Sequence, residues 1–573
     1  MNWRTLPLLA KLKGYQIRDL GHDLKAGINV ALLDFPQSMA YAMIAGLPIQ
    51  YGVHASALGS IIAPFFASSR FLITGPSNAT AVLLMSGFLS MGLEESQRLV
   101  VLPMLVLMVG CFLFAGAFLR LEVVIQYVSR AVITGYVTAA GFLIIVKQSP
   151  HVLGIEIEGS GTFLLTLQEI LQSSGMTQWP ILLFSALTPL IHFTLRRINP
   201  RLPSLALTIV LSTLLSILLQ RWGLHLQTLP NLPRGDWSLT VPLLDLKLIH
   251  SLLGTAFAIS LLSLLESSSI SKTVAARAGD TVDISQQMVS MGVANTVNAF
   301  GAGMPVSGSP VRTMLNYDSG ARTPVSSLIS GLLLLIAIFA LAPLIQYIPK
   351  ASLASMIMIV GISLIKWDTI KVFLRTSKSD AATFLVTFTS GLLFPLDIAI
   401  YFGVGLSIAL FLKKVANPTL QEVDFTDQGE VLGTRPERRS AISIVHVEGD
   451  LFFGSTDVFL DRMRDLVESP NLKVIILRML NAHHIDATAS LAIVNLIEFA
   501  RQNDRDVILA GVRDDMLPQI EKSGLAEVVG PDNLFRYTPE NLTLSTRNAL
   551  LRAQEIIGSK DTEVILMVKK DKE

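Results

Sequence analysis

The side chains best suited to chemistry in this chain are polar groups that interrupt long apolar segments. In the first such segment, Asp34 and Gln37 flank Pro36. The proline leaves a backbone carbonyl without its helical hydrogen bond, and the two neighbours add an acid and an amide. Polar groups at membrane depth are costly, so they usually face a cavity or a partner. A position near the membrane surface, or a pair with another helix, is the alternative for Asp34.

A second acid, Glu266, lies in a serine-rich segment. The serines recur every three or four residues, at Ser260, Ser263, Ser267 and Ser271. This spacing places them on one face of a helix, with Glu266 at its edge. A carboxylate in a low dielectric takes up a proton more readily, and it can instead ligate sodium. We therefore expect Glu266, with Ser263 and Asp34, to hold a coupling proton or sodium ion. A structural ion pair with Lys272 or Arg277 is the alternative.

Two segments rich in glycine and proline lie in the two halves of the apolar region, at residues 74–80 (TGPSNAT) and 301–312 (GAGMPVSGSPVR). Each predicts a helix that starts within the membrane, with Pro310 at a first helical position. The unpaired N–H groups and the positive dipole end of such a helix can hold an anion, and Arg312 adds a positive charge. Broken helices at corresponding places favour a transporter site over two ordinary loops.

The composition divides the chain into two parts. Its 573 residues are 51% hydrophobic and 16% charged, whereas a soluble domain carries about 25% charged residues. Residues 27–412 are mostly apolar, and residues 417–573 have a soluble composition. The net charge of +1 provides no basic field, so we expect no nucleic-acid partner. The single cysteine, Cys111, cannot form an internal disulfide, and no cleavable signal peptide is visible.

The apolar part predicts about a dozen to fourteen membrane crossings, since each needs about 20 apolar residues. Segments poor in charge lie at 101–118, 205–219, 328–347, 353–365 and 381–412, and further spans begin near Gly27, Gly52, Phe71, Ile125, Pro180, His250, Ile284 and Pro310. Lysine and arginine gather before the first span, at residues 196–201 and 366–378, and after the last span. The positive-inside rule then places both termini in the cytoplasm.

The tail predicts a small α/β domain with a largely parallel sheet. Strands are expected at 442–447, 473–479 and 507–511, and helices at 456–467, 487–501, 516–523 and 541–557. His483 and His484 beside Asp486 lack a third ligand at a suitable spacing, so we expect no metal. The chain contains no Walker sequence and no nucleophile elbow. We therefore expect no enzymatic activity and no cofactor apart from the coupling ion.

Residues 35–42 (FPQSMAYA), followed by Gly46, Pro48 and Gly52, resemble the first-span signature of the SulP family of sulfate-permease-type anion transporters. The stretches 75–76, 265–267 and 305–309 are similar to that family as well. The tail resembles a STAS domain at residues 474–477 and 485–489. The resemblance covers essentially the whole chain.

The resemblance implies fourteen spans in two inverted seven-helix repeats, divided into core and gate domains, and a homodimer in the cell membrane. The implied domains are a cytoplasmic N-terminal segment (1–26), the transport domain (27–416), a linker (417–440), a cytoplasmic STAS domain (441–558) and a polar tail (559–573). A regulatory protein or nucleotide is the partner expected at the STAS domain. Thr488 falls where related domains carry a phosphorylated serine, but its neighbours Ala487 and Ala489 depart from that pattern, which favours a helix-start role.

The resemblance also places the substrate between the starts of the third and tenth spans. The implied binding residues are Gln37, Tyr41, Pro76, Ser77, Asn78, Ser309, Val311 and Arg312. Val311 stands where much of the family has a hydroxyl residue. We expect secondary active transport of sulfate, bicarbonate or a dicarboxylate, coupled to protons through Glu266. A sodium-coupled bicarbonate symporter, a passive anion channel and a membrane-anchored sensor are the alternatives.

Overall fold

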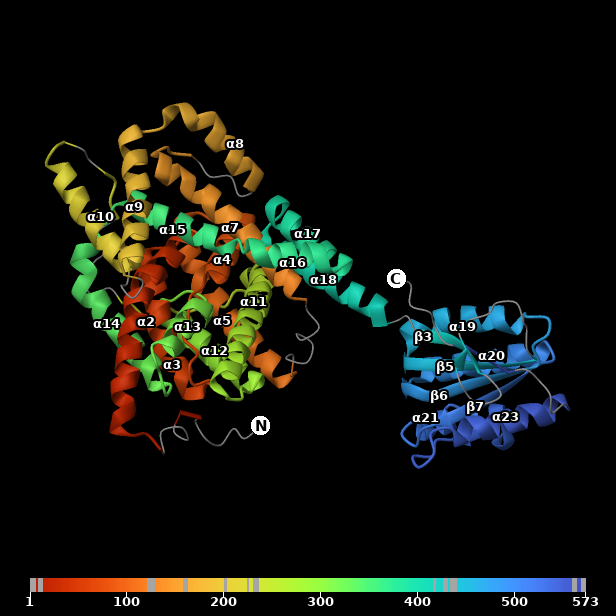
Figure 1. The fold of residues 1–573 in the computed structure, drawn as a ribbon. Helices are drawn as coiled ribbons and strands as arrows, with labels where there is room; N and C mark the ends of the chain where they lie inside the picture. The colour runs from red at the N-terminus through yellow and green to blue at the C-terminus, as the bar shows by residue number, and fades with distance from the viewer. Residues whose placement is uncertain are drawn as a thin grey trace. The chain divides into compact units, whose positions relative to one another are not determined.

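The computed structural model describes residues 7–8, 14–120, 129–157, 163–199, 204–223, 226–229, 237–415, 419–425, 431–432, 441–558 and 564–567. The chain forms two compact units, Met1–Ser407 and Ile408–Glu573. Figure 1 shows the first as a bundle of helices and the second as a sheet covered by helices. The boundary falls within the last long helix of the bundle, α18 (Leu396–Val415).

The helices of the first unit occur in two series with the same order. The first series is α2 (Ile17–Ile44), α3 (Ile49–Phe66), α4 (Asn78–Ser90), α5 (Glu95–Phe118), α7 (Arg130–Leu153), α8 (Phe163–Ser173), α9 (Trp179–Ile198) and α10 (Ser204–Gln220). The second is α11 (Leu246–Ala278), α12 (Ile284–Phe300), α13 (Pro310–Asp318), α14 (Val325–Ile345), α15 (Lys350–Leu364), α16 (Trp367–Thr376), α17 (Lys378–Leu393) and α18. The amphipathic helices α8 and α16 are the sixth described helix of their series, which leaves seven other described helices in each.

A short strand precedes the third helix of each series, and the two strands pair with each other. β1 (Thr74–Gly75) and β2 (Ser307–Gly308) are antiparallel, with Thr74 opposite Gly308. The backbone N–H of Ser309 extends the pairing by donating to the carbonyl of Ile73 at 3.0 Å. An antiparallel pair of strands has a local two-fold axis. This axis relates α4 to α13, as an inverted repeat requires.

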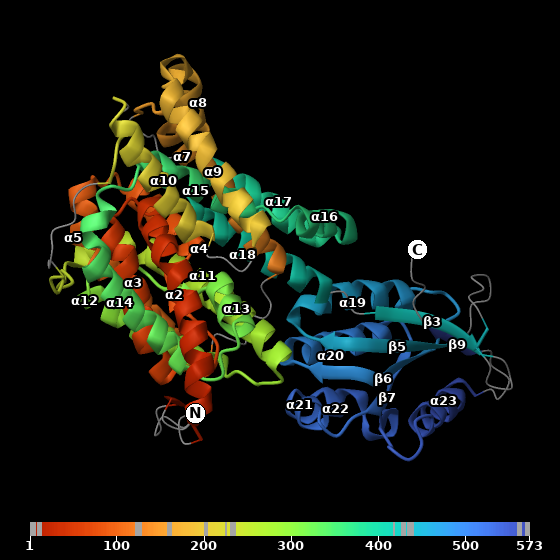
Figure 2. The same ribbon diagram turned by 60° about the vertical axis from the view of Figure 1, so that its left-hand side comes forward.

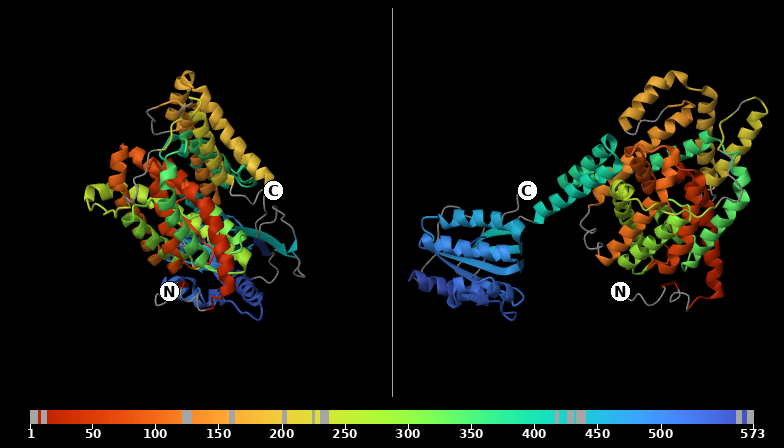
Figure 3. Two further views of the ribbon diagram at one scale, coloured as in Figure 1. Left: turned by 90° about the vertical axis from the view of Figure 1, so that its left-hand side faces the viewer. Right: turned by 180° about the vertical axis from the view of Figure 1, so that it is seen from behind.

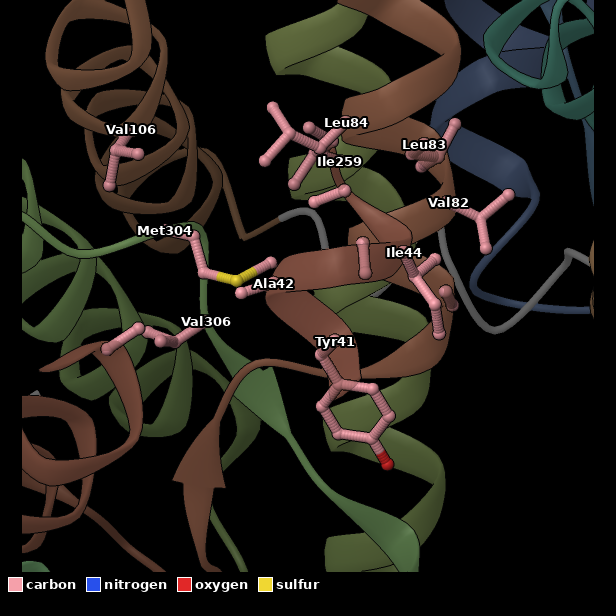
Figure 4. Close-up of a cluster of buried hydrophobic side chains, with 14 of the residues drawn as sticks. Tyr41, Ala42, Ile44, Val82, Leu83, Leu84, Val106, Ile259, Met304 and Val306 are labelled. Atoms are coloured by element: carbon pink, nitrogen blue, oxygen red, sulfur yellow. The ribbon is translucent and has the colours of Figure 1, made fainter. Parts of the chain in front are cut away.

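Helices from both series pack against one another around this strand pair. Helix α14 lies against α2 and α3, and α12 lies against α5, as the views in Figure 3 agree. A buried apolar cluster joins α2, α4, α5 and α11 with the segment before β2 (Figure 4). Figure 4 labels Ile44, Leu83, Leu84 and Ile259 in this cluster, which packs the half-helix α4 against the long helices α2 and α11.

Two predicted spans differ from the observed helices. The third helix begins at Asn78 and not near Phe71, because residues 74–75 are held in β1 by their pairing with β2. Segment 381–412 contains two helices, which break around Pro395. The start predicted near Ile125 lies outside the described residues. Among the described helices, α5, α7, α9 and α11 are both long and apolar enough to cross a membrane by length and composition.

The second unit is an α/β domain with a seven-stranded sheet in the order β4-β3-β9-β5-β6-β7-β8. The strands are β3 (Thr419–Phe425), β4 (Val431–Leu432), β5 (Ile442–Leu451), β6 (Val474–Ile485), β7 (Asp506–Val512), β8 (Leu534–Arg536) and β9 (Val564–Met567). The helices are α19 (Phe453–Val467), α20 (Ala487–Gln502), α21 (Leu517–Lys522), α22 (Leu525–Val529) and α23 (Leu544–Ile557). β5, β6, β7 and β8 are parallel, as predicted.

Alternation along the strands sorts these helices between the two faces of the sheet. Val445 and Val447 face α19, α20, α21 and α22, whereas Ile442 and Ile444 face α23. Figure 2 shows α19 and α23 on opposite faces. The expected linker, residues 417–440, contains strands β3 and β4, and the expected polar tail, residues 559–573, contains strand β9. Both segments therefore contribute to the sheet, contrary to the expectation. β3 and β9 pair with β5, so the first parallel strand has no open edge.

A partly buried histidine in this domain has a perturbed pKa, so we expect the stability of the domain to depend on pH. His446 on β5 lies opposite Arg478 on β6, with Arg478 Nη1 at 3.2 Å from His446 Nε2. Burial, and then the charge of Arg478, lower the pKa of His446 from 6.5 to about 4. The unfolded chain therefore takes up a proton between pH 6.5 and about 4 that the folded domain does not, so stability falls as the pH falls through this window.

We expect acidification from pH 7 to pH 5 to cost the domain on the order of 1 kcal/mol through His446. Hydrogen–deuterium exchange of β5 and β6 in the full chain, corrected for intrinsic exchange rates, measures this change. The loss should shrink in a His446→Gln variant and persist in a His484→Gln variant, since His484 is exposed in the same domain. An equal loss in both variants would contradict the assignment.

Candidate functional site

Both half-helices begin with a serine cap, as the sequence predicts. The Ser77 hydroxyl oxygen accepts from the backbone N–H of Thr80 at 3.2 Å, and α4 starts at the next residue. Ser309 caps α13 in the same way, accepting from the N–H of Arg312, and Pro310 is the first residue of that helix. Two helices therefore begin just after the paired strands β1 and β2, and the N–H groups of their first turns have no partner within the helix.

Glu266 on α11 connects the two helix starts. Its Oε2 atom accepts hydrogen bonds from the Ser77 hydroxyl at 3.0 Å and from the Ser307 hydroxyl at 3.1 Å. Within the described part of the chain, Glu266 forms no ion pair with Lys272 or Arg277, the alternative that the sequence left open. One carboxylate oxygen thus accepts a hydrogen bond from a serine in each half of the unit.

Arg312 forms a buried ion pair with a different acid, Asp34. Its Nη1 atom donates to Asp34 Oδ1, and both side chains have zero solvent exposure. The guanidinium also donates to Ser56 Oγ at 2.8 Å and to the carbonyl of Pro76 at 2.5 Å. Asp34 accepts a further hydrogen bond from the Ser56 hydroxyl. The positive charge expected to be available to an anion is therefore balanced by Asp34, which pairs with another helix.

Several predicted site residues present polar atoms that have no hydrogen-bond partner among the described residues. These atoms are Gln37 Oε1, Asn78 Oδ1 and Ser263 Oγ. Tyr41 is buried, and Figure 4 shows its hydroxyl directed away from the apolar cluster of Leu83, Leu84 and Ile259. Buried polar atoms are nearly always paired, so these groups are suited to a polar ligand or water. Val311 differs from the rest, because its side chain is 56% exposed.

Ser307 and Ser56 take part in the site although the sequence analysis did not single them out. Ser307 lies within the predicted glycine-rich break, and its place in that segment was a usable signal. Ser56 lies inside α3 with no motif around it. Its role follows from the crossing of α3 beside α2 and α13, which no local pattern encodes.

Thr488 lies in the first turn of α20, but it is not the residue that caps this helix. Asp486 is the cap of α20, since its Oδ1 atom accepts from the N–H of Ala489 at 2.7 Å and its Oδ2 atom from the N–H of Phe453 at 2.8 Å. Thr488 lies in the first turn with its side chain exposed. Its hydroxyl is accessible there, and a regulatory role stays a prediction.

Comparisons with known proteins agree with this architecture. The model of the Sulfate permease family matches residues 20–387, and the model of the STAS domain matches residues 435–540. Sulfate transporter 4.1, chloroplastic, of Arabidopsis thaliana is 26% identical over 543 residues, which cover 90% of this chain and 78% of that protein. The similar curated proteins bear the names of transporters and solute carriers, not of enzymes.

Two solved structures share the fold at lower identity. Murine Solute Carrier 26 family member A9, an anion transporter in the inward-facing state, matches with a TM-score of 0.86 at 20% identity, over 96% of this chain and 94% of that one. The transmembrane domain of BicA, a cyanobacterium bicarbonate transporter, matches with a TM-score of 0.60 at 22% identity, over 68% of this chain and 99% of that one. The chain is thus an α-helical polytopic membrane protein with a STAS domain, and the expected fourteen spans are consistent with this architecture.

We expect loss of either partner of the buried ion pair to destabilise the transport domain strongly. Arg312→Gln or Asp34→Asn leaves one buried charge without compensation, which costs about 3–5 kcal/mol. The double variant should lose less than the sum of the two single variants. Thermal unfolding of the detergent-solubilised chain measures these shifts.

Arg70→Gln is the matched control, because Arg70 pairs with Asp280 at 2.8 Å at the surface. It should cost at most about 1 kcal/mol. An Arg312→Gln variant as stable as Arg70→Gln would show that the buried pair does not hold the half-helices together.

Proposed function

Because the chain belongs to the sulfate permease family, we propose that it is a secondary active transporter that carries a small anion across the cell membrane together with a proton. The observation that supports this proposal most directly is the position of Glu266. Its carboxylate accepts one hydrogen bond from a serine hydroxyl beside each half-helix start, where an anion would otherwise be bound. The carboxylate and the substrate anion then compete for the same positive N-terminal ends of α4 and α13.

The charges at the site support coupling to a proton. Arg312 and Asp34 neutralise each other, so the remaining fields come from Glu266 and from two helix starts. Each helix N-terminus acts as about half a positive charge, so the two together offset one carboxylate. With Glu266 ionised, the site attracts an anion weakly. With Glu266 protonated, a net positive field of about one charge remains for the substrate.

The proposed cycle moves one proton and one anion together. A proton neutralises Glu266, and the anion then takes its place before the N–H groups at the starts of α4 and α13. Gln37, Tyr41 and Asn78 contribute polar atoms beside it, two of which have no described partner. The helices that carry the site then move against the others, which exposes the anion and the proton to the opposite side.

The proposed substrate class is supported by the names of the relatives and by the site, where the described residues include no positively charged side chain without an acidic partner. The similar proteins are named for sulfate and for bicarbonate, and both are small oxyanions that N–H and hydroxyl donors can hold. The alternative of sodium coupling rests on Ser263, whose unpartnered hydroxyl lies one turn before Glu266 on α11. A passive channel would need no titratable group between the two helix starts.

The proposed orientation places both termini and the STAS domain in the cytoplasm. Apart from the amphipathic helix α8, the described helices between the first basic cluster and the second are α2, α3, α4, α5, α7 and α9. Those between the second and the third are α10, α11, α12, α13, α14 and α15. Two more, α17 and α18, precede the last cluster at Lys413 and Lys414. All of these numbers are even, so the basic clusters share one side, which is typical of the cytoplasmic face. We propose a homodimer in the membrane, as the family resemblance implies.

A Glu266→Gln variant should keep anion exchange but lose proton-driven accumulation, because a neutral side chain mimics the protonated acid and cannot release its proton. Uptake of labelled sulfate, bicarbonate or fumarate into proteoliposomes, with proton or sodium gradients imposed, measures this accumulation. Asp318→Asn is the control, since Asp318 is an exposed acid on α13. It should accumulate substrate as the unchanged chain does.

Persistent proton-driven accumulation in Glu266→Gln would contradict the coupling role of this residue. Accumulation driven by sodium alone in the unchanged chain would favour the sodium symporter. Single-channel current steps without accumulation would favour the channel.

A further inference from the structure

A polar cavity lies at the end of the bundle where α2 and α7 end and where α9 and α15 begin, and Glu266 is not part of its lining. Its volume is about 590 Å³, and its lining includes Met43 and Ile44 of α2 and Met85 and Leu89 of α4. In Figure 1, α8, α9 and α15 mark this end, opposite to the start of α2. The cavity begins about one turn beyond Tyr41 on α2 and about two turns beyond Asn78 on α4.

The wall facing α2 and α4 is basic. Lys147 and His151 of α7 and Lys350, the first residue of α15, line it. Within the described residues, neither lysine ammonium has an ion-pair partner, and Glu156 is the single acid among the lining residues. Arg98 lies beside the cavity as well, because its guanidinium reaches the carbonyl of the lining residue Gly46 at 3.4 Å.

The cavity lies between two pairs of helices. Helices α2 and α4 carry candidate substrate-site residues, and helices α7 and α15 pack closely against each other. An ion in the cavity would touch both pairs at once. Partly buried lysines without a carboxylate partner create a positive potential, and low-dielectric walls concentrate it. The chemistry that fits is a small anion, since it compensates the excess charge and accepts from the ammonium groups.

We propose that this cavity is a second anion-binding site, an outer vestibule that gathers the substrate before it reaches the helix starts. This inference rests on the proposed anion transport. Lys147 and Lys350 hold the anion there, and Glu156 at the cavity wall limits the net charge so that the anion can leave. Binding at the vestibule raises the local anion concentration, and it therefore affects the concentration at which transport is half-maximal, not the maximal rate.

Uptake kinetics of a Lys147→Gln variant test this role. We expect KM for the anion to rise about three- to tenfold at low ionic strength with kcat unchanged, and the difference to shrink in high salt because the ions screen the field. Lys147→Arg should keep the wild-type KM. Lys247→Gln is the matched control, because Lys247 is an exposed lysine at the start of α11 that does not line the cavity. An unchanged KM in Lys147→Gln, or an equal rise in Lys247→Gln, would overturn the proposal.

A second measurement is independent of transport. Gln178 lines the cavity and is exposed, so a Gln178→Cys variant in a Cys111→Ser background carries one reactive thiol at its wall. Its labelling rate with a negatively charged methanethiosulfonate, divided by the rate with a positively charged one, reports the local potential. We expect this ratio to exceed the ratio for a free thiol and to fall several-fold when Lys147→Gln is added.

The two measurements separate the vestibule from the transport mechanism. A ratio that does not depend on Lys147 overturns the vestibule even if uptake and its Glu266 dependence are observed. A ratio that falls as expected supports the vestibule even if proteoliposomes show no proton-driven uptake, in which case the proposed coupling fails alone.

Discussion

The structure of the transport domain depends on one buried ion pair. Arg312, in the first turn of α13, and Asp34, in the middle of α2, have no solvent exposure. The same guanidinium bonds to the carbonyl of Pro76, directly before the other half-helix. A lone buried charge is far more costly than a paired one, so Arg312 and Asp34 must stay together or separate together. The pair therefore fixes the distance between two helix starts that belong to different halves of the sequence.

This constraint decides which acid faces the two helix starts without a charged partner. Because Asp34 and Arg312 compensate each other, neither supplies net charge to a ligand, and Glu266 becomes the acid that faces both helix starts. Serine hydroxyls from the two breaks point to it, so a change of its charge is felt equally in both halves of the bundle. A carboxylate placed before two helix N-termini resembles a bound anion in charge and in hydrogen bonding. Competition between this internal anion and an external one is a simple physical route to coupling.

The basic cavity near Lys147 complements that site. At the helix starts the field comes from backbone N–H groups, which act at short range and cannot attract an anion from solution. Side-chain ammonium groups act over a Debye length of about 8–10 Å at physiological ionic strength. Collection and close recognition of the anion would then be performed by different groups, on helices that pack differently. The STAS domain is a separate compact unit, and it presents Thr488 on an exposed helix start.

Local patterns in the sequence determined much of this protein. Apolar length and composition predicted the membrane bundle, strand–helix alternation predicted the parallel α/β tail, and Ser77 and Pro310 marked the two half-helix starts, because caps and breaks depend on neighbouring residues. The pairing of Asp34 with Arg312, the role of Ser56, the bond from Ser307 to Glu266 and the strands β3 and β9 were decided by tertiary structure. Each of these joins residues far apart in the chain, and the free energy of such a contact depends on which helices or strands cross there, which no local spacing encodes.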